Sequence, residues 1–167
     1  MLAMVFTTTA SLLGKPSVLV IFAAASVLLG SAARLLAPHR GWCTTPAVLA
    51  AVGLALAVAV TQGRQPFEIT AVGFAQCTLT SSSSDSSEVL LNLVMLMPAA
   101  FLAVQATRRP LGPVLLCVGA SGLAELTQAL FNTGGCSGQD LVINSAGVLV
   151  AAFTSWALLA LTRRRSA

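Results

Sequence analysis

Long apolar runs with only short polar breaks between them constrain this chain more than any other feature of its sequence. Hydrophobic residues make up 56% of the 167 residues, charged residues only 8%, and the mean hydropathy is +0.89. An average soluble domain carries roughly 25% charged residues. Because a membrane-spanning helix needs about 20 apolar residues, the chain has room for about five spans with short links and for no soluble domain.

We therefore expect an all-α fold, a polytopic membrane bundle of about five transmembrane helices. Residues 1–16 are assigned to an N-terminal extension at the membrane interface, although residues 1–14 also suit a short further span. Residues 17–167 then form a single membrane domain. Pro98 falls in the middle of the third span and predicts a kink there. The predicted spans cover approximately residues 17–37, 46–61, 89–107, 111–131 and 141–161.

The basic residues predict the orientation of these spans. Five spans place Lys15 and Arg64 on one side of the membrane and all the other basic groups on the opposite side. The positive-inside rule then puts the C-terminus in the cytoplasm and the N-terminus outside. The net charge of +4 is thus explained by orientation and by contact with anionic lipid head groups, and we expect no nucleic-acid partner. The residues on the cytoplasmic side are Arg34, Arg40, Arg108, Arg109 and the triplet at 163–165.

Polar side chains recur at helical spacing within the outer part of the predicted membrane domain. Residues three or four apart share one face of a helix. An ionisable group is costly inside a membrane and usually has a function. We expect these side chains to line one polar cleft open to the exterior, whereas the alternative is that they only tie helices together. The candidate ligand-binding residues are Asn92 in the third span, Ser121, Glu125 and Gln128 in the fourth, and Asp140 and Asn144 in the fifth.

The common catalytic and metal-binding patterns are missing from the sequence. The single histidine, His39, lies on the side opposite to the polar cleft, so no Ser–His or Cys–His pair can be assembled there. No Cys/His spacing fits zinc, and two carboxylates are a weak indication of a cation site. We therefore expect no metal and no cofactor, and Glu125 is the one candidate catalytic residue.

The four cysteines divide between the two sides. Cys77 and Cys136 fall on outward links, whereas Cys43 is cytoplasmic and Cys117 lies within the fourth span. Because disulfides persist on the oxidising side, we expect a bond between Cys77 and Cys136. The alternative is two free thiols in the links.

Three short segments resemble the VanZ-like family of membrane proteins. Residues 88–102 are similar to its N-x-x-x-F-x-P-x-G-F segment, residues 121–128 to its S-x-x-x-E-x-x-Q helix, and residues 140–147 to its D-x-x-x-N-x-x-G helix. The resemblance covers about residues 88–160. Ala100 stands where the family segment has glycine. The stretch before Asp140 also lacks the arginine and acidic residues that are usual there, and carries Gly134, Gly135, Ser137 and Gln139.

The resemblance implies a bacterial cell-membrane protein, since the founding member of the family is linked to low-level resistance to the glycopeptide teicoplanin. The expected function is that of an accessory protein of the cell envelope. It would bind a lipid-linked cell-wall component or a glycopeptide antibiotic in the outward cleft, with membrane lipid around it. The alternative is an intramembrane enzyme that acts on an envelope lipid with Glu125 as general acid or base. A transporter has little support, because no inverted repeat is visible.

Overall fold

The computed structural model shows an all-helical membrane protein and describes residues 14–63, 86–131 and 137–165. Five helices in this part of the chain are long and apolar enough to cross a membrane, which confirms the predicted fold class. The third of these spans is divided into two helices. In chain order the helices are α2 Pro16–His39, α3 Thr44–Gln62, α4 Ser86–Met95, α5 Met97–Thr107, α6 Leu111–Phe131 and α7 Gly138–Arg165.

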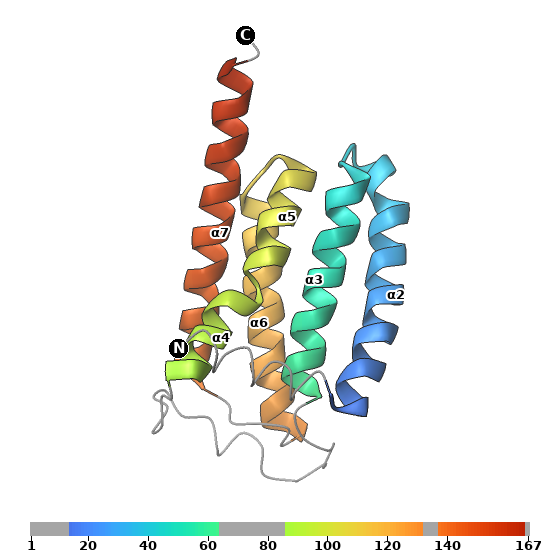
Figure 1. Ribbon diagram of the computed structural model, residues 1–167, viewed down its shortest axis with the longest axis vertical. Helices are drawn as coiled ribbons and strands as arrows, with labels where there is room; N and C mark the ends of the chain where they lie inside the picture. The colour runs from blue at the N-terminus through green and yellow to red at the C-terminus, as the bar shows by residue number, and fades with distance from the viewer. Residues whose placement is uncertain (1–13, 64–85, 132–136, 166–167) are drawn as a thin grey trace.

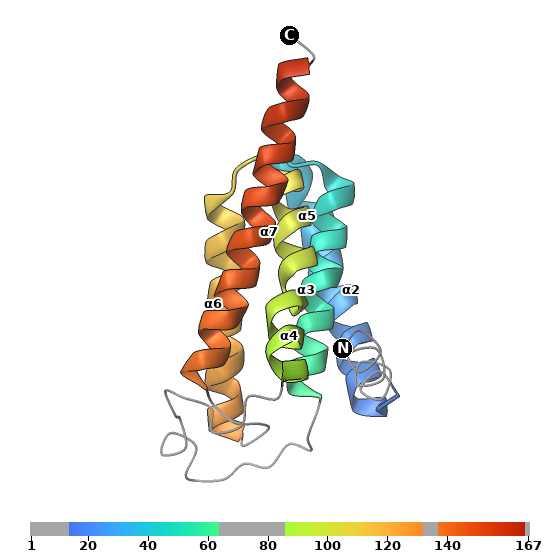
Figure 2. The same cartoon turned by 60° about the vertical axis from the view of Figure 1, so that its left-hand side comes forward.

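The spans run up and down side by side, and α2 lies at one edge of the bundle (Figures 1 and 2). Helix α2 packs against α3, α3 packs against α5, and both halves of the third span pack against α7. Helix α6 lies against α7, with smaller contacts to α3 and α5. This arrangement brings the end of α3, the end of α6 and the start of α7 to the same end of the bundle.

The third span breaks where the sequence predicts a kink. Proline has no N–H group and its ring clashes with the preceding turn, so it suits the first turn of a helix and not its interior. Helix α4 accordingly ends at Met95, and α5 begins at Met97 with Pro98 in its first turn. The backbone N–H of Ala100 donates to the Leu96 carbonyl at 3.0 Å, which restores regular bonding beyond the break. The predicted kink is therefore confirmed, as a full interruption of the helix.

Small side chains form the centre of the bundle. Ala99 and Ala100 of α5 are buried with Ala57 of α3 and Ala151 of α7. A Cβ atom built on Gly53 would lie 3.4 Å from the Ala99 nitrogen, so α3 and α5 approach each other closely at this point. Small residues allow such close approach, which is the main source of helix association within lipid. Alanines at four-residue spacing on α3 face the bundle: Ala47, Ala55 and Ala59 are buried and Ala51 is half-buried.

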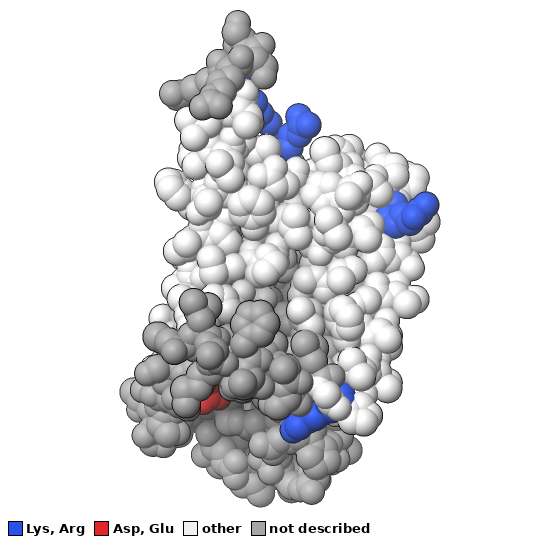
Figure 3. All heavy atoms as spheres, in the orientation of Figure 1, with Lys and Arg blue, Asp and Glu red and all other residues white. Residues whose placement is uncertain are grey.

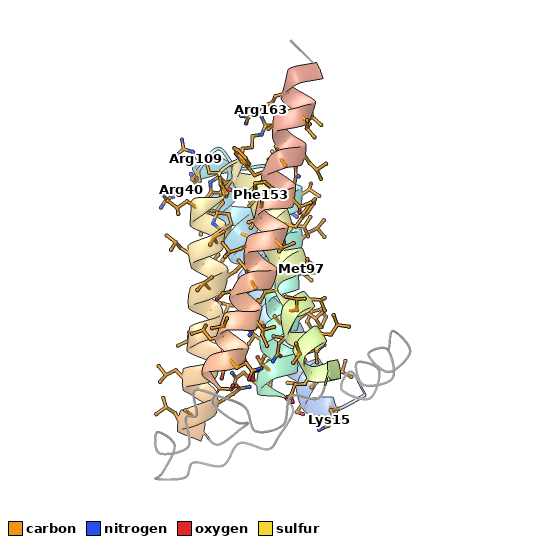
Figure 4. The ribbon with its side chains drawn as sticks, turned by 90° about the vertical axis from the view of Figure 1, so that its left-hand side faces the viewer. Lys15, Arg40, Met97, Arg109, Phe153 and Arg163 are labelled. Carbon is orange, nitrogen blue, oxygen red and sulfur yellow. The ribbon has the colours of Figure 1, made fainter. Side chains whose placement is uncertain are left out.

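One end of the bundle carries most of the basic groups, and we call it the arginine end, defined by Arg40, Arg108 and Arg109. Figure 4 shows Arg40, Arg109 and Arg163 toward this end and Lys15 toward the opposite one. The N–H of Cys43 donates to the Ala106 carbonyl at 3.0 Å and ties the link between α2 and α3 to the end of α5. The basic asymmetry on which the orientation rests is thus present, while the orientation itself stays a prediction.

Candidate functional site

The predicted polar residues lie toward the end of the bundle opposite to the arginine end, and we call it the polar end, defined by Gln62, Glu125 and Asp140. Acidic atoms visible in the face drawn in Figure 3 lie toward this end. Helices α3 and α6 end here and α7 begins here. The up-and-down course of the chain therefore brings the side chains at these helix ends close together.

The first set of polar contacts joins α6 to α7. The Asn144 Nδ2 group donates to the Ser121 Oγ at 3.0 Å, and these side chains are only 4% and 3% exposed. One turn further along α6, the Glu125 carboxylate accepts a hydrogen bond from the backbone N–H of Ser137 at 2.9 Å. Asp140 lies close enough to Glu125 for an electrostatic interaction between the two carboxyl groups. Four of the six predicted ligand-binding residues are thus neighbours across one helix pair.

Two buried oxygen atoms in this set have no hydrogen-bond partner among the described residues. They are the Oδ1 of Asn144 and the Oγ of Ser137. Buried polar atoms are nearly always paired in folded proteins, and each exception needs a physical explanation. The Asn144 amide donates to Ser121, so its remaining carbonyl oxygen is an acceptor ready for a donor group.

The second set of polar contacts joins α6 to α3. The Gln62 Nε2 group donates to the Thr127 Oγ1 at 2.7 Å, and a longer bond of 3.4 Å reaches the Ala124 carbonyl. The Gln128 Nε2 group donates to the Thr61 carbonyl at 3.3 Å. Gln128 was expected to face Asp140 and Asn144, but its amide is directed to α3 instead. Its contact is therefore one between neighbouring helices at the rim of the predicted site.

Sequence reasoning missed Gln62 and Thr127. A glutamine at the end of an apolar run is typical of the membrane interface, so Gln62 carried no signal of a partner on α6. Thr127 directly precedes Gln128, and its hydroxyl also donates to the Ala124 carbonyl of its own helix at 2.8 Å. Because a threonine within a helix commonly makes such a local bond, nothing in the sequence indicated a partner on α3.

Asn92 enters the bundle from α4. It is 6% exposed, and α4 packs along α7. The next residue, Leu93, meets α7 so closely that a Cβ atom built on Gly147 would overlap its carbonyl oxygen. Gly147 therefore allows α4 and α7 to pack closely, as small residues do between membrane helices. Further along α7, the Ser155 hydroxyl donates to the Phe101 carbonyl at 2.9 Å and joins α7 to α5, the other half of the third span.

The other side chains that could react or bind a metal ion lie away from the polar end. His39 and Cys43 are exposed at the arginine end, and Cys117 is buried in the middle of α6. Within the described ranges, no group of three or more His, Cys, Asp or Glu side chains is placed to hold a metal ion. Cys77 and Cys136, which the sequence pairs in a disulfide, lie outside the described residues.

The fold and the site together define a class: a polytopic helical membrane protein with a cluster of acidic and amide side chains toward one end of an otherwise apolar bundle. Within this class, the sequence model of the VanZ/LLP1 family matches residues 63–160, and the chain belongs to that family. The matched region contains α4 to α6 and most of α7, and with them all six predicted ligand-binding residues. No curated protein and no solved structure matches the chain.

Proposed function

We propose that this protein binds an amphiphilic molecule of the bacterial cell envelope at the polar end, either a lipid-linked cell-wall component or a glycopeptide antibiotic. The observation that carries the proposal is the buried Asn144 Oδ1 acceptor, which has no hydrogen-bond partner among the described residues and belongs to the helix pair that carries Glu125 and Asp140. A network built only to tie helices together would be expected to satisfy its own buried atoms.

The chemistry of the site favours a ligand that is rich in hydrogen-bond donors. Glu125 and Asp140 accept hydrogen bonds when ionised, and the Asn144 carbonyl oxygen can do nothing else. Sugar hydroxyls, peptide amides and amines supply such donors, and cell-wall precursors and glycopeptides carry groups of these kinds. The flanking leucines, among them Leu123 and Leu126, are exposed on the bundle surface and suit a hydrocarbon tail beside the polar group.

A second function is favoured by the pairing of Glu125 with Asp140. Two neighbouring carboxyl groups can divide the roles of general acid and general base between them. The protein would then be an intramembrane enzyme acting on an envelope lipid, with Glu125 as the group that transfers the proton. Incubation of the purified protein with candidate lipids separates the two functions, because only the enzyme releases a product.

Binding is tested with purified protein in detergent, with teicoplanin and a lipid-linked disaccharide–peptide precursor as the two probes. Glu125→Gln removes the charge and keeps the shape. Because a hydrogen bond to a charged group contributes about 1.5–3 kcal/mol, we expect roughly a tenfold to hundredfold weaker binding. Glu88→Gln is the matched control, since Glu88 is an exposed acidic residue of α4 toward the same end.

A second pair of variants distinguishes a role of Asn144 in ligand binding from a role in holding α6 against α7. Ser121→Ala removes the partner of the Asn144 amide group, whereas Asn144→Ala also removes the unpartnered acceptor. We expect both to lower stability and only Asn144→Ala to weaken binding strongly. Equal binding by both variants, or no binding of either probe by the unaltered protein, would overturn the proposal. Normal teicoplanin tolerance of cells that carry Glu125→Gln would count against a role in resistance.

A further inference from the structure

An apolar groove lies in the other half of the bundle, toward the arginine end. Its volume is about 360 Å³, and it is lined by residues from α2, α3, α5 and α6 together with Trp42. Binding sites for small organic groups have volumes of this order. Residues that represent the four helices and the link are Ala33, Trp42, Ala50, Ala103, Gly112 and Leu116.

The groove exists because the helices that border it carry small side chains at positions where larger side chains would fill the space. Ala50 of α3 and Ala103 of α5 face it, and Gly112 of α6 has no atom within 4 Å of a Cβ position. The lining includes the hydroxyl of Thr107, but this group already bonds to the Ala103 carbonyl at 2.9 Å. The walls therefore suit a hydrocarbon chain and offer little to a polar ligand.

Basic residues stand next in sequence to the residues that line this groove at the arginine end. Arg40 precedes the lining residue Trp42 by two positions, and Arg108 and Arg109 connect the lining residues Thr107 and Gly112. All three arginines are exposed. The acidic residues in the described part of the chain are Glu88 near the start of α4, Glu125 near the end of α6 and Asp140 near the start of α7, so they lie toward the polar end instead.

We propose that this groove binds an acyl chain of an anionic phospholipid, whose phosphate is held by Arg40, Arg108 and Arg109. Basic clusters beside clefts between membrane helices recognise anionic lipid head groups, and the guanidinium group suits phosphate. The groove supplies the apolar half of the same molecule. This site is separate from the polar end, and it does not depend on the proposed function.

The groove is tested by native mass spectrometry of the purified protein with phosphatidylglycerol and, in parallel, zwitterionic phosphatidylcholine. Gly112→Leu fills the groove, and Gly119→Leu is its matched control on the same helix. Neither glycine has an atom within 4 Å of its Cβ position, and Gly119 does not line the groove. We expect the unaltered protein to bind phosphatidylglycerol more tightly than phosphatidylcholine. Gly112→Leu should bind phosphatidylglycerol about tenfold more weakly, whereas Gly119→Leu should bind it as the unaltered protein does.

The head-group contact is tested by the combined variant Arg40→Gln, Arg108→Gln and Arg109→Gln, with Arg163→Gln as the control. A basic residue near a charged head group contributes about 1 kcal/mol, so each replacement should weaken phosphatidylglycerol binding about fivefold. Phosphatidylcholine binding should change little. Equal affinity of the unaltered protein for the two lipids would overturn the proposal. Loss of binding in the arginine variant without any effect of Gly112→Leu would also overturn it, because the lipid would then lie outside the groove.

Discussion

Replacing Gly147 with alanine tests the close contact between α4 and α7. The new Cβ atom would overlap the Leu93 carbonyl oxygen and lie 2.9 Å from the Leu93 carbonyl carbon and 3.4 Å from the Met97 Cγ atom. The Met97 side chain can move aside, but the Leu93 atoms belong to the helix backbone. The two helices must therefore separate, and the contacts around Asn92 and Asn144 should loosen with them.

Overpacking of this kind costs about 1–3 kcal/mol of unfolding free energy. For a protein of this size, each kcal/mol lowers the midpoint of thermal unfolding by about 2–4 °C. The measurement is thermal unfolding in detergent, followed by circular dichroism. Gly119→Ala is the control, because its Cβ position is open and alanine favours helix by up to about 1 kcal/mol. If Gly147→Ala is as stable as the Gly119→Ala control, the close approach of α4 and α7 is wrong.

Two further predictions concern the sides of the membrane. Cys43 is exposed at the arginine end, so a variant that keeps only this cysteine should react with a membrane-impermeant maleimide in broken cells and not in intact ones. Reaction in intact cells would reverse the predicted orientation. The disulfide between Cys77 and Cys136 stays a prediction from the sequence, and closing such a loop contributes about 2–4 kcal/mol. Mass spectrometry after alkylation without reductant should find the two cysteines linked, and recovery of both as free thiols would refute the bond.

The membrane spans were predictable because the signal is strong and local. Each span is a long apolar run that ends at polar residues, proline or glycine, and Pro98 located the break between α4 and α5. The predicted bounds of the fourth span agree with α6, whereas those of the fifth span were too short at both ends of α7. This helix begins at Gly138 and continues to Arg165, because helical hydrogen bonding extends beyond the apolar stretch into polar residues such as Asp140 and Arg163.

The candidate site was predictable only where helical spacing decides it. Ser121 and Glu125 share a face of α6, and the short link before α7 brings that face to Asn144 and Asp140. The direction of Gln128 depends on a third helix, α3, which is far away in the sequence. Periodicity within one helix shows which residues share a face. Which other helix each of these residues contacts depends on how the whole bundle packs.

The interruption at Leu96 has a mechanical consequence. A continuous helix transmits a tilt along its whole length, whereas φ and ψ changes at a helix end can absorb a rotation locally. Helix α4 therefore takes the direction set by its close contact with α7 at Gly147, while α5 takes the direction set by the contact of Ala99 with Gly53. The two halves of the third span can therefore run in different directions on either side of Leu96. One half carries Asn92 toward the polar end, and the other forms a wall of the apolar groove with Ala99 and Ala103.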